Sequence, residues 1–341
     1  MSPTLPPGGE FISCDWGTTA LRLHLVNPVG EAPVASVASR EGIAAVHRAW
    51  LARGPESPGR EGFYLAVVQG QLEQLAKAVG RSLAGLPLVM SGMASGTLGV
   101  RALPYRALPF SLDGGDLAWA VLPATPEFPH SWLLISGARV ADDVMRGEET
   151  QLVGAAVLER AAWADGLVVL PGTHSKHVRV RGGRAIGLRT YMSGEFYDLL
   201  VRHTILASSV DPAAACAPEM ARQAFAEGVG DGAADNLLHT AFGVRVAEIS
   251  GHRLAAASHH YLSGLVIGSE LGELREGDEP AITLVGSAEL VARYRAALEI
   301  LCPATRLATV AGDAAIIAGQ RALAIQAKLL PAFSPPCSHP S

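Results

Sequence analysis

One short stretch of this sequence, Asp15-Trp16-Gly17-Thr18-Thr19, places a carboxylate beside a small polar turn. Backbone N–H groups and the two threonine hydroxyls of such a turn can bind phosphate oxygens. Asp15 can hold a hydrated Mg²⁺ ion, because hard cations take carboxylate oxygens and keep several waters. The alternative interpretation is an ordinary hairpin in which the Asp and Thr side chains cap the turn.

A second turn repeats the Gly-Thr pair. It reads PGTHSK over residues 171–176, with the pair at Gly172 and Thr173. The two turns together favour the use of a nucleotide more than either does alone. No Walker-type GxxxxGK[ST] loop, HExxH motif or GxSxG motif occurs in the sequence.

Two adjacent carboxylates, Glu148 and Glu149, stand at the start of an expected helix. A carboxylate in this position could take a proton from a substrate hydroxyl. The alternative is that both simply interact favourably with the helix dipole. Neighbouring helical residues point about 100° apart, so at most one of the two should face a substrate. We favour Glu148 as the general base, with Glu149 as the second candidate. If neither glutamate is the base, Asp143 is the first alternative.

Two further positions carry weaker signals. Gly286 and Ser287 lie between an expected strand and an expected helix, where a nucleotide base could pack against the backbone, although an ordinary turn also fits. Asp313 stands at the start of another expected helix. There we prefer a helix cap to a contact with phosphate or metal.

The elements that must position these residues form a repeating pattern. Strand, Gly-Thr turn, strand, turn and strand are predicted twice, and the second series is followed by a helix. The strands are expected at 11–14, 21–26 and 33–39, and again at 167–170, 177–181 and 185–190; the helix is expected at 194–207. The pattern indicates an internal duplication at the level of supersecondary structure. Alternating strands and helices in both halves predict an α/β fold.

Other helices are expected at 148–164, 219–241, 259–274, 288–301 and 314–329. A chain of 341 residues is long enough for two domains, each with its own core. We expect one domain over residues 10–165, with the first phosphate turn and a substrate site, and another over 166–330, with the second turn and a nucleotide-base site. Residues 1–9 and the tail 331–341 are rich in Pro, Gly or Ser and are expected to be disordered.

Composition excludes several classes of protein. Hydrophobic residues make up 49% and charged residues 17%, which is typical of a compact folded chain. The net charge of −5 and the lack of any basic run argue against nucleic-acid binding. The four cysteines are far apart with no CxxC pair, so a reducing cytoplasm is the natural compartment. No apolar run reaches the ~18 residues of a membrane span, and the N-terminus does not read as a signal peptide.

Eight stretches together give the chain a specific likeness. They are DWGTTALR (15–22), VMSGMASG (89–96), DVMRGEETQLVGA (143–155), VLPGTHSKHV (169–178), RTYMSGEFYDLLVRHTIL (189–206), YLSGLVIGSEL (261–271), ITLVGSAELVARY (282–294) and VAGDAAIIAG (310–319). With them the chain resembles the 2-dehydro-3-deoxygalactonokinase family of sugar-acid kinases, within the actin/hexokinase/Hsp70-like ATPase superfamily. It departs from the family at His177, where Trp is usual, and at 136–138, where Ser-Gly-Ala replaces Pro-Gly-Leu.

The resemblance implies a duplicated ribonuclease H-like (actin-like ATPase) fold, in two domains around a central cleft. It also implies transfer of the γ-phosphate of ATP to the 6-hydroxyl of 2-dehydro-3-deoxy-D-galactonate in galactonate catabolism, with Mg²⁺ held by Asp15 through water. Phosphates would be bound by Gly17, Thr18, Thr19, Gly172, Thr173 and His174, and adenine by Gly286 and Ser287. The sugar acid would lie near Arg22, Gly92, Met93, Arg146 and Glu195, where Arg146 could pair with its carboxylate. A homodimer stays open as the assembly.

Two other functions remain open. The chain could be a kinase of the same superfamily that acts on another sugar acid or on an amino sugar. It could also be a non-catalytic regulator that binds a nucleotide. The carboxylates Glu148 and Glu149 argue against the regulator, and no added helix-turn-helix or peptide-binding domain is recognisable in the sequence.

Overall fold

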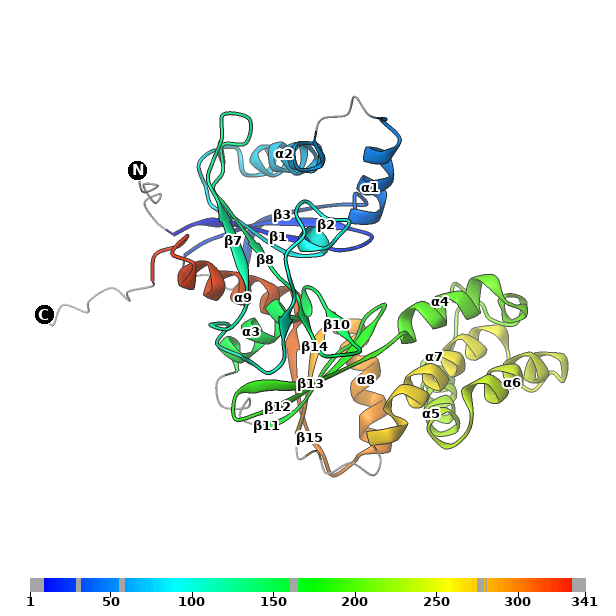
Figure 1. Cartoon of the computed structure of the whole chain (residues 1–341). Coiled ribbons are helices and arrows are strands. Elements are labelled where there is room, and N and C mark those ends of the chain that lie inside the picture. Colours follow the sequence, from blue (N-terminus) through cyan, green and yellow to red (C-terminus); the bar gives the residue numbers. More distant parts are fainter. Residues whose placement is uncertain are drawn as a thin grey trace, which may run out of the picture. The chain divides into compact units, whose positions relative to one another are not determined.

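The computed structural model describes residues 9–28, 32–54, 59–159, 165–274, 279 and 281–332, and Figure 1 labels its elements. These residues divide into two compact units. Unit 1 contains the described parts of 1–164, 181–187 and 312–341, and unit 2 contains those of 165–180 and 188–311. The expected disordered ends, 1–9 and 331–341, lie almost entirely outside the described residues. In the part of the chain that is described, no helix combines the length and apolar character needed to cross a membrane.

Unit 1 is built on a six-stranded sheet with the strand order β3-β2-β1-β4-β8-β7. Its strands are β1 (Phe11–Trp16), β2 (Leu21–Val26), β3 (Pro33–Ser39), β4 (Leu88–Gly92), β7 (Trp119–Leu122) and β8 (Trp132–Ile135). The first three strands are antiparallel, whereas β4 is parallel to both β1 and β8. The run Phe11–Cys14 is completely buried, as expected of a central strand covered on both faces.

Four helices accompany this sheet: α1 (Ile43–Leu51), α2 (Arg60–Val79), α3 (Glu148–Leu158) and α9 (Gly312–Gln326). Figure 1 shows α1 and α2 on one side of the sheet and α3 with α9 on the other. Helices α3 and α9 touch through their backbones, since a Cβ on Gly154 would lie 1.7 Å from the carbonyl oxygen of Ala315. This contact fixes α3, whose first residues are the candidate acids.

Unit 2 contains a sheet with the order β15-β14-β11-β12-β13. The strands are β11 (Asp165–Leu170), β12 (Ser175–Arg181), β13 (Arg184–Tyr191), β14 (Ala281–Gly286) and β15 (Arg306–Ala311). Strand β14 runs parallel to β11 and β15. The first residues of β13 belong to unit 1, where Arg184 and Ala185 pair with β6 (Phe110–Ser111).

The helices of unit 2 are α4 (Ser193–His203), α5 (Pro218–Ala234), α6 (Leu237–Ile249), α7 (Ala255–Leu271) and α8 (Ala288–Leu301), with short 3₁₀ turns η2 (Ile205–Ser208) and η3 (Gly272–Leu274). Helix α7 is buried over most of its length and packs against α4, α5, α6 and α8. One hydrophobic core lies between the sheet and helices α7 and α8. A second core lies among helices α4, α5, α6 and α7.

The predicted duplication is confirmed, because β1–β3 and β11–β13 both follow the strand, turn, strand, strand order. The single helix expected over 219–241 is wrong. It is two helices, α5 and α6, because the side chain of Asn236 accepts a hydrogen bond from Leu238 N–H and starts a new helix. The helix expected over 148–164 ends at Leu158, and 160–164 lie outside the described residues. Helix α1 was not predicted.

The two units differ from the expected domains 10–165 and 166–330 mainly at α9. This helix belongs to unit 1, where it packs on α3, β1 and β4. The buried amide of Gln320 donates to Cys14 O at 2.9 Å and to Ser91 Oγ at 2.8 Å, which ties α9 to the two central strands. A single boundary in the sequence cannot describe these units, because residues after unit 2 belong again to unit 1.

Candidate active site

Asp15 lies near the carboxyl end of β1, opposite Arg22 on β2 and Ser91 on β4. Its side chain is 15% exposed and accepts a hydrogen bond from Arg22 Nη1 at 3.0 Å. Burial raises the pKa of Asp15 above its usual value; Arg22 offsets part of this effect, and the negative charge of Asp313 adds to it. The carboxylate is therefore short of positive charge, which is the environment that a bound cation would relieve.

The Gly17–Thr19 turn is held from two sides. Gly17 N–H closes it on Ala20 O at 2.9 Å, and the first turn of α1 donates to it, from Ile43 N to Gly17 O at 3.0 Å. Thr18 and Thr19 are exposed. The unpredicted helix α1 thus holds the turn through its backbone and leaves both threonine side chains exposed.

Three backbone segments converge beside Asp15. Gly92 ends β4 with φ of 82°, and a Cβ there would lie 2.8 Å from Trp16 O and 3.4 Å from an Asp15 carboxylate oxygen. Gly147, with φ of 110°, precedes α3, and its Cβ would lie 3.2 Å from Gly92 Cα. A side chain is strained at both positions. The end of β1, the end of β4 and the start of α3 therefore meet at Asp15.

Glu148 and Glu149 both reach back to the backbone before α3. Glu148 is half-buried and accepts a hydrogen bond from Arg146 N at 2.8 Å. Glu149 is fully buried, and its two oxygens accept from Gly147 N at 3.0 and 2.8 Å. The pair therefore separates into one partly accessible and one inaccessible carboxyl group. Asp143, in the preceding loop, accepts from Val144 N at 2.7 Å and is half-buried.

The protonation of Glu149 differs from that of an ordinary glutamate. Burial, followed by repulsion from Glu148, raises the pKa of Glu149 to about 8, while hydrogen bonds from Gly147 N–H and Thr150 act in the opposite direction. At neutral pH this carboxyl group is therefore mainly protonated. A neutral acid cannot act as the base for a substrate hydroxyl, so the environment separates the roles of the two neighbours.

The guanidinium of Arg146 is already bound within unit 1. It stacks on the Tyr105 ring with 4.0 Å between Cζ and the ring centroid. Its Nη1 donates to Ser95 O at 2.6 Å, its Nε donates to Tyr105 Oη at 3.3 Å, and its Nη2 reaches Leu103 O at 3.5 Å. The contact from Nη2 is the longest, so the N–H groups of this nitrogen are the ones most readily donated to another acceptor. Ser95 lies in η1 (Met93–Ser95), next to the candidate residue Met93.

The second Gly-Thr turn, in unit 2, rests on the start of α4. A Cβ on Gly194 would lie 2.4 Å from Gly172 O, and Glu195 N donates to Thr173 O at 3.0 Å. His174 Nε2 lies 2.6 Å from a Glu195 carboxylate oxygen. The structure therefore brings four candidates together in unit 2. A Cβ on Gly172 would meet nothing within 4 Å, so its backbone is open to a ligand.

A pocket of about 450 Å³ adjoins this turn within unit 2. Gly172, α4, α7 and α8 form its walls, and the lining residues are Gly172, Ser193, Gly194, Tyr197, Pro212, His259, Ser263, Val266, Ile267, Glu289, Leu290, Arg293 and Tyr294. Arg293 crosses it between Ser263 Oγ and Glu289, at 2.9 Å from each. Gly286 and Ser287 stand just before this α8 wall: Ser287 caps α8, and a Cβ on Gly286 would lie 3.6 Å from Pro171.

Sequence reasoning missed the buried carboxylate of Glu270, behind the second turn. Its Oε1 accepts hydrogen bonds from Ser175 at 2.7 Å and lies 2.8 Å from His177 Nε2, while Oε2 accepts from Tyr294 at 2.6 Å. Burial alone raises the pKa of Glu270, but the bonds and charge of its partners outweigh burial and hold the pKa below its usual value. The sequence signal that could have revealed this site is a glutamate within the otherwise apolar helix α7. The contact with Glu270 also explains why a polar residue, His177, can be buried here.

The fold and these sites define a class of protein. The chain has the duplicated ribonuclease H-like fold of the actin-like ATPases, with one Gly-Thr turn in each unit and an acidic helix start beside the first. A crystal structure of a protein assigned as a 2-dehydro-3-deoxygalactonokinase from Sinorhizobium meliloti matches it with a TM-score of 0.75 and 31% identity, over 93% of this chain and 99% of that one. This class is the ATP-dependent sugar-acid kinases.

The family model of 2-keto-3-deoxy-galactonokinases matches residues 15–323. The chain belongs to this family. It is 34% identical over 327 residues to a probable 2-dehydro-3-deoxygalactonokinase of Rhizobium meliloti (strain 1021), covering 93% of this chain and 97% of the relative. It is 32% identical over 325 residues to the 2-dehydro-3-deoxygalactonokinase of Escherichia coli (strain K12), covering 92% and 97%.

Proposed function

We propose that this kinase transfers the γ-phosphate of ATP to the 6-hydroxyl of 2-dehydro-3-deoxy-D-galactonate, in galactonate catabolism. The observation that carries the proposal is the convergence of Asp15, Gly92 and the start of α3 within unit 1. It supports the proposal because Asp15, the proposed metal-binding residue, and Gly147, just before the proposed base Glu148, both lie close to Gly92. The substrates named for two full-length relatives support the choice of sugar acid.

In this proposal the phosphates are bound by the two turns and the base of ATP by the pocket of unit 2. Thr18 and Thr19 supply exposed groups in one turn, and Gly172, Thr173 and His174 supply them in the other. A pocket of about 450 Å³ lies in the range of small-molecule sites. Gly286 and Ser287 would contact adenine from the strand-to-helix turn before α8.

Asp15 is the residue that would hold Mg²⁺. Its fit rests on the charge balance described above, since burial makes the anion unfavourable and Arg22 compensates only in part. Among the described residues no group of three or more His, Cys, Asp or Glu side chains is arranged to bind a metal. A bound Mg²⁺ would neutralise charge on the phosphates. Asp15 itself would orient the hydrated ion through its free lone pairs.

Glu148 is the proposed general base. Its carboxylate is partly accessible and is oriented by the hydrogen bond from Arg146 N. Glu149 is placed as its support: the protonated carboxyl group is bound to Gly147 N–H and shapes the turn that carries Glu148. Asp143 is the next candidate if Glu148 proves dispensable.

Within unit 1 the sugar acid is proposed to contact Gly92, Met93, Arg146 and Arg22, and Glu195 of unit 2 stays a further candidate. Arg146 can offer Nη2 to the substrate carboxylate while Nη1 and Nε keep their bonds to Ser95 and Tyr105. A two-nitrogen fork on the carboxylate would require release of one of those bonds. In this proposal Arg146 first holds Ser95 and Tyr105 in place, and second offers a positive charge to the carboxylate of the sugar acid.

A coupled ATPase assay with a panel of sugar acids and amino sugars tests the function. We expect 2-dehydro-3-deoxy-D-galactonate to give the highest kcat/KM. Equal or better turnover of another acceptor would favour the alternative that the chain is a kinase for another sugar acid or for an amino sugar. ATP binding without any acceptor-dependent turnover would favour the non-catalytic regulator. Glu148→Gln should lower kcat by ~100-fold or more, whereas Glu149→Gln should stay within a few-fold of wild type at pH 7.

Three finer statements belong to the same proposal: Mg²⁺ as the metal, the cytoplasm as the compartment, and a homodimer as the assembly. The compartment is supported by the spacing of the four cysteines in the sequence, which contains no CxxC pair. The homodimer is argued below from the exposed surface of α6.

A further inference from the structure

One face of α6 is exposed to solvent and apolar. Leu238 is 78% exposed, Phe242 55%, Val246 48% and Ile249 69%. Between these four positions, the helix exposes only His239 and Gly243. No Asp, Glu, Lys or Arg occurs among these six exposed residues, whereas a solvated helix face normally carries charged side chains.

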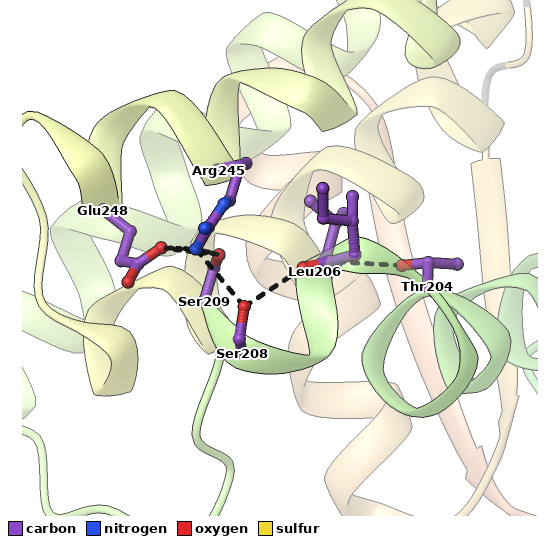
Figure 2. A network of polar contacts seen from close by, with 7 residues as sticks. Thr204, Leu206, Ser208, Ser209, Arg245 and Glu248 are labelled. Carbon is purple, nitrogen blue, oxygen red and sulfur yellow. Dashed lines mark hydrogen bonds and ion pairs between the residues drawn. The ribbon is translucent and has the colours of Figure 1, made fainter.

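This face cannot be buried by turning the helix. The opposite face of α6 packs into the second core of unit 2 through Ala241 and Val244. Arg245 and Glu248 form an ion pair at the edge of the helix. Arg245 Nη1 lies 3.3 Å from Ser208 Oγ of η2, and Ser209, the residue after η2, donates to Glu248 at 3.0 Å. Figure 2 shows this network, with Ser208 and Ser209 directed toward Arg245 and Glu248.

Two segments next to α6 each expose a further large apolar side chain. Ile205 in η2, which packs on α6, is 62% exposed, and Leu254, shortly after α6, is 68% exposed. Six large apolar side chains exposed to this extent present roughly 600 Å² per copy, estimated at about 100 Å² each. Two copies would then bury roughly 1,200 Å², which reaches the lower limit of stable specific interfaces.

We propose that this surface, Ile205, Leu238, Phe242, Val246, Ile249 and Leu254, is the interface of a homodimer in which two α6 helices pack antiparallel about a twofold axis. The positions on α6 are symmetric about the middle of the helix. Leu238 and Ile249 are equidistant from a point near residue 244, and so, within half a residue, are Phe242 and Val246. In a twofold pair, Leu238 of one copy therefore meets Ile249 of the other, and Phe242 meets Val246.

A second copy fits this surface better than a membrane does. Helices that lie on membranes carry Lys or Arg beside their apolar face that can reach the lipid headgroups, whereas the arginine beside this face, Arg245, is held in an ion pair with Glu248. At the centre of the symmetric pattern, Gly243 is exposed, and a Cβ there would meet nothing within 4 Å, so it leaves room for a close helix approach. The inference deepens the proposed homodimer and does not depend on the phosphoryl-transfer chemistry.

Sedimentation velocity of the full chain from 1 to 100 µM tests the interface. We expect a dimer for the wild type, and a monomer for the double variant Leu238→Glu/Phe242→Glu, with a dissociation constant raised by at least 100-fold. Ile300→Glu, at a 45% exposed apolar position on α8, is the matched control and should stay dimeric. A monomeric wild type at 100 µM, or equal loss of dimer in the control, would overturn the proposal.

The proposed register has its own test. Leu238→Lys alone should weaken the dimer, and the combination Leu238→Lys/Ile249→Glu should restore it, because each new charge then meets its opposite on the other copy. Failure of the combination to recover, while circular dichroism shows folded protein, would refute the antiparallel pairing. Pelleting with neutral or anionic lipid vesicles in place of dimer formation would identify a membrane surface and also refute it. Kinase activity per subunit, measured in parallel, shows separately whether the proposed reaction holds.

Discussion

Glu149 should make the stability of this protein depend on pH in a direction opposite to that of most carboxylates. Its side chain is fully buried at the start of α3, and burial together with Glu148 raises its pKa to about 8 from 4.5. Between these two values the folded state keeps a proton that the unfolded state has lost. Folding stability from this group is therefore full below about pH 4.5 and falls as pH rises towards about 8.

The magnitude follows from the same two values. Each pH unit inside the window removes about 1.4 kcal/mol, so the whole window amounts to about 4–5 kcal/mol. Glu149→Gln has no proton to lose and keeps the hydrogen bond from Gly147 N–H to its amide oxygen. Between pH 5 and pH 8 the variant should therefore gain about 4 kcal/mol relative to wild type.

Urea unfolding of both proteins at half-unit steps from pH 5 to pH 9 measures this difference. Subtracting the two stability curves removes every group that titrates equally in both. Glu148→Gln is the control: it should lower the pKa of Glu149 by removing its neighbour's charge, so the fall in stability should end at a lower pH and be smaller. A difference between wild type and Glu149→Gln that stays constant within 1 kcal/mol across the range would refute a protonated Glu149.

Three further substitutions test the candidate site. Asp15→Asn should keep the fold but lower kcat about 100-fold at limiting Mg²⁺, equivalent to ~3 kcal/mol of transition-state stabilisation; near wild-type kcat would remove Asp15 from the metal site. Arg146→Lys should raise KM for the sugar acid at least tenfold with a small effect on KM for ATP, because lysine cannot keep the stacking on Tyr105 and the bonds to Ser95; equal effects on both KM values would contradict the assignment. Glu270→Ala should lower the free energy of unfolding by about 3–5 kcal/mol and weaken ATP binding in calorimetry, because its buried partners lose their acceptor; unchanged values would show that the network is dispensable.

Much of the fold could be read from the sequence because its strands are short, apolar and separated by Gly-containing turns. The run from Phe11 to Cys14 and the Gly172-Thr173 turn carry that information locally. The division at Asn236 was missed because alanines before it and leucines after it favour a continuous helix, and one cap decides the break. The return of α9 to unit 1 depends on long-range contacts such as that of Gln320 with Cys14, which no local pattern contains.

The candidate site shows the same limit. Residue types and spacing indicated that Glu148 and Glu149 would differ, since a helix separates neighbouring side chains by about 100°. They could not indicate that Glu149 would be buried enough to hold a proton, because that depends on the packing of α3 against other elements. For Arg146 the charge was visible in the sequence, but its bonds to Ser95 and Tyr105, about 50 and 40 positions away, were not.

The place of α9 in unit 1 has a consequence for biosynthesis. Residues 312–326 complete the packing around β1 and β4, yet they leave the ribosome only after all of unit 2. All residues of unit 2 precede them in the chain, so unit 2 can fold during translation while the first-made strands of unit 1 still lack their cover. Until α9 has been made, those strands, which include the buried run Phe11–Cys14, would be the segment that a chaperone has to protect.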